Sequence, residues 1–147
     1  MRSLKIYIAG PYSADSEEKI MKNVWKAIDA GIKLWKMGHY PYIPHLTHWI
    51  DERSKNIGVK MSYEEYRNWD APWLDFCDAV LHLGNSNGAN AEVRRALQTG
   101  KPVFKSIREI PKVDRERTWV ASSSEEQVPE GSNDNKNDID ISLRPTS

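Results

Sequence analysis

The segment from Ala79 to Glu92 constrains the fold more than any other part of the chain. It opens on a short, mostly apolar run, Ala79–Leu83, of the length and composition typical of a strand buried inside a parallel sheet. A loop of serine, asparagine and glycine follows, and a helical pattern begins after it. Parallel strands deliver such loops to the carboxyl edge of an open α/β sheet, where ligands bind. The segment therefore predicts an α/β fold with a binding crevice at this loop.

The rest of the N-terminal region alternates strand-like and helix-like segments in the same way. The expected strands and helices are, in chain order, Leu4–Ala9, Ser16–Trp35, Tyr40–Pro44, Ser62–Phe76, Asp78–Leu83, Ala89–Thr99 and Lys101–Lys105. This alternation predicts right-handed crossovers and a three-layer α/β fold, flavodoxin-like or Rossmann-like. We expect a four- or five-stranded parallel sheet with the first strand central. The two prolines of the second strand favour an edge position for it.

Two further segments bear on how the helices pack. Arg53–Lys60 is polar and contains glycine, which is typical of a mobile loop or lid. Ser62 and Glu65 form a capping-box pattern at the start of the next helix. The aromatic residues expected to face inward from the helices are Trp25, Trp35, Tyr66, Trp69, Trp73 and Phe76. Because the helix after Ser62 offers more apolar surface than a small sheet can cover, we also expect a homodimer or higher homo-oligomer.

Length and charge divide the chain into a domain and a tail. We assign residues 1–120 of the 147 to one domain and residues 121–147 to an acidic tail of disordered composition. Of 21 acidic and 21 basic residues, six acidic and two basic ones lie from Ala121 onward, which leaves 15 and 19 before it. A mildly basic body fits a small anionic substrate. There is no basic stripe with interleaved aromatics, so we expect no nucleic-acid polymer as partner.

The chain also gives signals about its cellular setting. It has no apolar run long enough to span a membrane and no signal-peptide pattern, so no membrane partner is expected. The single cysteine, Cys77, cannot form an internal disulfide framework, and its apolar neighbours predict a buried thiol. These features indicate a reducing, cytoplasmic location.

Two carboxyl groups are candidates for chemistry at the predicted crevice. Glu92 lies about one turn into the helix after the loop, and Asp70 lies on the helix before the strand, so the two can converge. Gly88 allows close approach of the backbone to a ligand, and the N–H groups at the helix start attract an anion. Both residues also have simpler interpretations: Glu92 as a helix acid favoured by the dipole, and Asp70 as an acid that faces solvent.

Other kinds of site find little support. His39, His45 and His48 lack the glutamate spacing of a catalytic zinc site, and no cysteine pair supports a structural one, so we predict no metal. The G-x-S-x-G elbow, the G-x-G-x-x-G fingerprint and the P-loop lysine motif are all missing. We therefore expect no dinucleotide and no other cofactor.

Five motifs in order resemble the nucleoside 2-deoxyribosyltransferase family and its hydrolytic relatives, the 2′-deoxynucleoside 5′-monophosphate N-glycosidases. The likeness covers roughly residues 4–105 and is specific for the superfamily, not for the substrate. The motifs are Lys5-Ile6-Tyr7-Ile8-Ala9-Gly10-Pro11-Tyr12, Pro44-His45, Asp70-x-x-Trp73-Leu74, Cys77-Asp78-Ala79-Val80 and Ser86-x-Gly88-x-x-x-Glu92.

The resemblance implies a role for each matching residue. Glu92 matches the family's nucleophilic glutamate, Asp70 the aspartate that works beside it, and Tyr7 the tyrosine that orients the glutamate. The residues that the resemblance places near a substrate are Gly10, Pro11, Tyr12, His45, Asp78, Ser86, Asn87 and Gly88. Asp78 can also simply form hydrogen bonds at the start of its strand.

The expected activity is therefore cleavage or transfer of the N-glycosidic bond of a (deoxy)nucleoside or a nucleoside 5′-monophosphate. The first loop, Pro11-Tyr12-Ser13, is less basic than is usual in the monophosphate hydrolases, so hydrolase and transferase both remain open. The alternative is a non-catalytic nucleotide-binding or sensor module on the same fold. The joint presence of Tyr7, Asp70 and Glu92 favours the enzyme, because a binding module does not need them as a set.

Overall fold

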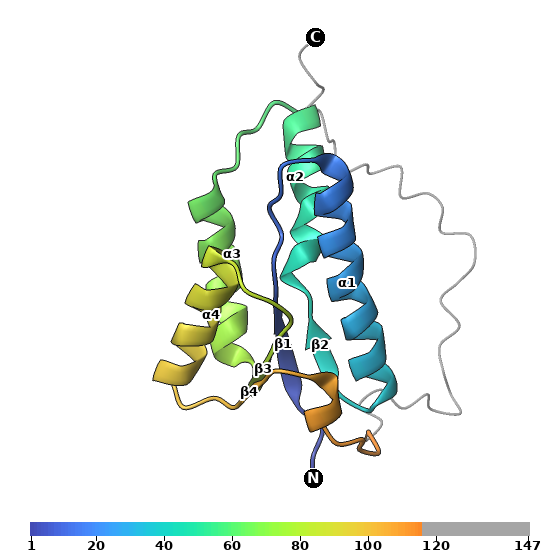
Figure 1. Cartoon of the computed structure of the whole chain (residues 1–147). Coiled ribbons are helices and arrows are strands. Elements are labelled where there is room, and N and C mark those ends of the chain that lie inside the picture. The colour runs from blue at the N-terminus through green and yellow to red at the C-terminus, as the bar shows by residue number, and fades with distance from the viewer. Residues whose placement is uncertain (116–147) are drawn as a thin grey trace, which may run out of the picture.

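A parallel β-sheet forms the centre of the protein in the computed structural model, which describes residues 1–115 (Figure 1). Within this range the sheet has four strands in the order β2-β1-β3-β4, and every pair is parallel. The strands are β1 (Lys5–Ala9), β2 (Tyr40–Tyr42), β3 (Ala79–His82) and β4 (Val103–Phe104). The helices are α1 (Glu17–Lys36), α2 (Thr47–Asn56), α3 (Tyr63–Phe76) and α4 (Asn87–Gln98), with 3₁₀ turns at Pro44–Leu46 and Ile107–Glu109.

Helices cover both faces of the sheet, with α1 on one side and α3 and α4 on the other (Figure 1). The alternation of side chains along β1 shows the two layers. Ile6 and Ile8 pack with Leu34 of α1, whereas Tyr7 and Ala9 pack with the other layer. The prediction of a three-layer α/β fold with the first strand central is confirmed. The predicted edge position of β2 is confirmed as well.

The helix boundaries follow the capping residues seen in the sequence. Ser62 accepts a hydrogen bond from the Glu65 backbone, and the Glu65 carboxylate accepts one from the Ser62 backbone, which completes the predicted capping box. After α1, Gly38 adopts a φ of +97°, a conformation that favours glycine. A Cβ at Gly38 would also lie 2.0 Å from the carbonyl oxygen of Val113, so this turn has no room for a side chain.

The prediction of a loop or lid at Arg53–Lys60 is wrong for its first half, because α2 continues to Asn56. Two side-chain contacts at i, i+4 spacing support this polar helix, one between His48 and Glu52 and one ion pair between Lys55 and Asp51. His48 lies 3.3 Å from Glu52, and Lys55 lies 2.8 Å from Asp51. Such pairs stabilise a helix that lacks a clear apolar stripe.

The prediction of inward-facing aromatic residues is wrong for most of them. The tryptophans of α1 and α3 are about half exposed, and Phe76 is 66% exposed. Small and aliphatic side chains such as Ala27, Ala30 and Leu34 fill the space under α1 instead, because a short sheet leaves little depth for wide rings. The residues of this exposed set are Trp25, Trp35, Trp69, Trp73 and Phe76. The homo-oligomer that we expected from the aromatic face of α3 stays a prediction.

Two further expectations meet the structure. Cys77 is buried, as its apolar neighbours predicted. Among residues 1–115, no helix combines the length and the apolar character that crossing a bilayer requires. The predicted tail at residues 121–147 lies outside the described residues.

Candidate functional site

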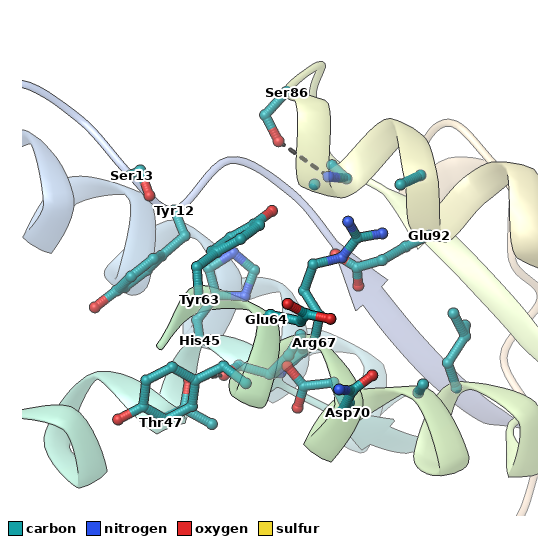
Figure 2. Close-up of a pocket in the computed structure, with 18 of the residues that line it drawn as sticks. Tyr12, Ser13, His45, Thr47, Tyr63, Glu64, Arg67, Asp70, Ser86 and Glu92 are labelled. Carbon is teal, nitrogen blue, oxygen red and sulfur yellow. Dashed lines mark hydrogen bonds between the residues drawn. The ribbon is translucent and has the colours of Figure 1, made fainter. Parts of the chain in front are cut away.

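A pocket of about 820 Å³ opens at the carboxyl ends of β1, β2 and β3 (Figure 2). The loop after β1 contributes Gly10 and Tyr12, the turn after β2 contributes His45, and the loop after β3 leads into α4. Helix α3 supplies the opposite wall. Because the carboxyl ends of adjacent parallel strands meet at one edge, three separate segments of the chain converge here.

Glu92 projects into this pocket from the second turn of α4 (Figure 2). Burial raises the pKa of its carboxyl to about 7, and the negative charge of Asp70 acts in the same direction. Hydrogen bonding from the Tyr7 hydroxyl and the charge of Arg67 both lower the pKa, but by less than burial raises it. The Oε2 atom is buried and has no hydrogen-bond partner among the described residues. Glu92 thus brings to the pocket a carboxyl group with a raised pKa and one buried oxygen that has no hydrogen-bond partner within residues 1–115.

Asp70 faces the same pocket from α3. Burial raises the pKa of this carboxyl to about 6, whereas a hydrogen bond from Tyr42 lowers it. The Tyr42 hydroxyl donates to Oδ1 over 3.1 Å. Two carboxyl groups with raised pKa values therefore line one pocket, and Asp70 and Glu92 converge there as their places before and after β3 allowed.

Tyr7 lies on β1, beneath both carboxyl groups. Burial raises the pKa of its hydroxyl well above the usual range, and the charges of Glu92 and Asp70 raise it further. The phenol therefore keeps its proton at any physiological pH and acts as a hydrogen-bond donor. This placement fits the orienting role that the resemblance implied for Tyr7.

His45 fixes the loop that follows β1. Its Nε2 atom lies 3.1 Å from the carbonyl oxygens of both Gly10 and Pro11. Carbonyl oxygens only accept hydrogen bonds, so Nε2 carries the proton. Burial lowers the pKa of the ring, which keeps it neutral. Pro11 is not among the residues that line the pocket, and its contact with the site is the hydrogen bond that its carbonyl oxygen accepts from His45.

Tyr12 turns its hydroxyl away from the pocket centre, toward α2 (Figure 2). Its oxygen lies 2.9 Å from Nδ1 of His48, and Nε2 of the same ring faces Glu52. Because Glu52 can only accept from Nε2, Nδ1 accepts the proton of Tyr12. This chain of contacts locks the ring of Tyr12 in place at the wall of the pocket.

The start of α4 forms the third wall. Ser86 caps the helix by accepting a hydrogen bond from the backbone of Ala89 over 3.1 Å. Ser86, Asn87 and Gly88 all line the pocket, and their role in substrate binding stays a prediction. A Cβ at Gly88 would lie 2.7 Å from the hydroxyl oxygen of Tyr63, so glycine lets Tyr63 of α3 reach the start of α4.

Asp78 lies elsewhere, at the amino end of β3. Its carboxylate accepts a hydrogen bond from the backbone of Lys5 over 2.8 Å and two from the Arg2 guanidinium over 3.2 Å. It is not among the residues that line the pocket. The structure therefore gives Asp78 the strand-start role that was the alternative to substrate binding.

The sequence reasoning missed several residues of the pocket region, among them Tyr63 and Arg67, which line the pocket, and Tyr42, which contacts Asp70. Tyr42 could have been found from strand register, because it pairs with Tyr7 at the same level of the sheet. No comparable signal marks the other two, which reach the pocket through the first turns of α3.

Within residues 1–115, no three histidine, cysteine, aspartate or glutamate side chains gather in a way that could hold a metal ion. A family model described as a domain of unknown function (DUF4406) matches residues 4–105, which include all four strands and both carboxyl groups. Among curated proteins, none matches this chain.

Proposed function

Because this chain belongs to the DUF4406 family, whose description names no activity, we propose its function from the site itself. We propose that the protein cleaves or transfers the N-glycosidic bond of a (deoxy)nucleoside or nucleoside 5′-monophosphate. Glu92 is the nucleophile and Asp70 the general acid. The observation that carries this proposal is the pair of buried carboxyl groups, both with raised pKa values, in one pocket.

An N-glycosidic bond breaks through a state with positive charge at the anomeric carbon of the sugar. As the bond from this carbon to the base nitrogen breaks, its electron pair leaves with the base, which takes a proton from Asp70. The carboxylate of Glu92 stabilises the positive charge, and one of its oxygens bonds to the carbon. Water, or a second base, then attacks the carbon while the bond from the carbon to Glu92 breaks and its electron pair returns to the Glu92 carboxylate. Asp70 accepts the proton that the attacking group releases.

The two carboxyl groups share one proton near neutral pH. With pKa values of about 6 for Asp70 and about 7 for Glu92, the pair holds one proton in the intervening pH range, and more of it resides on Glu92 than on Asp70. The proposed steps use the form in which this proton lies on Asp70 and Glu92 is ionised. One acid and one carboxylate are what a glycosidic cleavage through a covalent intermediate requires. The hydroxyl of Tyr7 favours the ionised form of Glu92 and opposes the larger effect of burial, which is the basis for giving Tyr7 an orienting role beside the nucleophile.

The start of α4 and the side chain of Arg67 supply positive charge at the pocket. The backbone N–H groups at the N-terminus of a helix such as α4 attract phosphate. Nucleoside 5′-monophosphates are therefore better candidate substrates than nucleosides.

The test is incubation of the protein with a panel of nucleosides and 5′-monophosphates, with release of free base followed by chromatography. We expect release from at least one monophosphate, and none from the Glu92→Ala variant. Glu18→Gln is the matched control, because Glu18 is an exposed acid on α1. Addition of a second free base separates transfer from hydrolysis. Binding of a nucleotide without any turnover would contradict the proposal and support the sensor module instead.

A further inference from the structure

Tyr42 occupies the centre of an aromatic stack beside the two carboxyl groups. Its ring stacks on Tyr7, with centroids 5.4 Å apart and an interplanar angle of 22°. On its other side it stacks on Trp73 of α3, at 5.8 Å and 16°. The Tyr42 hydroxyl donates to Oδ1 of Asp70 over 3.1 Å. Tyr42 thus contacts Tyr7, the neighbour of Glu92, through its ring and Asp70 through its hydroxyl.

We propose that Tyr42 is a positioning residue that couples the two carboxyl groups. Its hydroxyl holds Asp70, and its ring holds the Tyr7 phenol in place to donate to Glu92. This inference rests on the proposed function for its catalytic meaning. The geometry on which it depends can be tested without any substrate.

The arrangement of the elements explains why such a coupling residue is needed. Asp70 and Glu92 project from different helices, α3 and α4, whereas Tyr7 and Tyr42 lie on adjacent strands in register with each other. The sheet is more rigid than a helix pair that meets across an open pocket. The stacked rings of Tyr7 and Tyr42, which lie on two hydrogen-bonded strands, therefore hold both carboxyl groups in fixed positions relative to the sheet.

The titratable groups near Asp70 come from three other elements. They are Tyr7 on β1, Tyr42 on β2 and Glu92 on α4, whereas the charge of Arg67 acts on Glu92. Among the described residues, Tyr42 is the one whose side chain donates a hydrogen bond to Asp70. Hydrogen bonding to a carboxylate favours its ionised form, so loss of this donor leaves burial to dominate and raises the pKa of Asp70.

The experiment is an NMR titration of the aspartate and glutamate carboxyl carbons in the full chain, without substrate. In Tyr42→Phe we expect the titration midpoint of Asp70 to move up by about one pH unit. Glu92 should move less, because phenylalanine keeps the stack on Tyr7. Tyr40→Phe is the matched control. Tyr40 lies on the same strand but contacts Trp35 and Arg115, so neither midpoint should move.

A second variant separates the ring from the hydroxyl. Tyr42→Leu removes both, so the midpoint of Glu92 should now rise as well, because Tyr7 loses its support. An unchanged Asp70 midpoint in Tyr42→Phe, or an equal shift in Tyr40→Phe, would overturn the inference. If Tyr42→Leu does not fold, the Tyr42→Phe result still decides it.

The titration and the substrate panel can fail independently. An absence of turnover contradicts the proposed function. The coupling of the two carboxyl groups is still decided by the titration midpoints of Asp70 and Glu92. Where turnover is found, the pH–rate profile of Tyr42→Phe should move to higher pH together with the Asp70 midpoint. A profile that stays in place while the midpoint moves would refute a positioning role in catalysis.

Discussion

The raised pKa of Glu92 predicts that this carboxyl destabilises the folded protein at neutral and alkaline pH. The carboxyl has its ordinary pKa of 4.5 when exposed and a pKa of about 7 in the folded state. A raised folded pKa means that the folded protein binds this proton more tightly than the unfolded chain does. Stability is therefore highest below pH 4.5 with respect to this group, and it is lost as the pH rises through about 7.

The magnitude follows from the two pKa values. One pKa unit corresponds to about 1.4 kcal/mol, so a gap of roughly 2.5 costs about 3 kcal/mol at pH 8. Replacement of Glu92 by glutamine removes the charge and keeps the shape. The amide leaves buried N–H groups that need partners, which offsets part of the gain. We expect Glu92→Gln to raise the free energy of unfolding by about 2 kcal/mol at pH 8.

Urea unfolding of the wild type and of Glu92→Gln at pH 5 and pH 8 measures this effect. The stabilisation should be present at pH 8 and nearly absent at pH 5, where most of the wild-type carboxyl is protonated. Glu18→Gln, at an exposed position on α1, should show no such dependence on pH. A Glu92→Gln variant that is less stable than the wild type at pH 8, or equally shifted at both values, would refute the reasoning.

Three further predictions concern the rate and the fold. The pH–rate profile should be bell-shaped with limbs near pH 6 and pH 7, because the active pair holds one proton; a rate that is flat from pH 5 to pH 8 would contradict this. Asp70→Asn should lose at least 100-fold in kcat, roughly the worth of general acid catalysis, and Tyr7→Phe should lose less, since it removes one orienting hydrogen bond. Gly38→Ala should lower the free energy of unfolding by at least about 1 kcal/mol, because the residue has positive φ and its Cβ would meet Val113; urea unfolding checks this.

The sheet could be predicted from the sequence because its strands carry local signals. The β-forming run at Lys5–Ala9 ends at Gly10-Pro11, and the prolines at 41 and 44 mark an edge strand. The convergence of Asp70 and Glu92 also followed, since one precedes and one follows the same strand. These inferences need only chain order and the known geometry of parallel sheets.

The misplaced residues show what local patterns leave out. Asp78 directly precedes β3 whereas Ser86 follows it, and a strand of four residues puts its two ends roughly 13 Å apart. Resemblance by motif order carried no information about which end of the strand each motif occupies. The prediction that the tryptophans of α1 and α3 face inward was wrong for another reason. Helical spacing shows that residues share a face, but not whether another element of the chain covers that face.

The most direct test of the account is to trap the covalent intermediate on its nucleophile. A substrate with an electron-withdrawing group at the sugar 2-position slows both steps by destabilising positive charge at the anomeric carbon. With a good leaving base, such a substrate should let the glycosyl-enzyme accumulate. Intact mass and peptide mapping should place one sugar on Glu92 and none in the Glu92→Gln variant. An adduct on Asp70, or turnover of the wild-type kind in Glu92→Ala, would contradict the assignment of Glu92 as nucleophile.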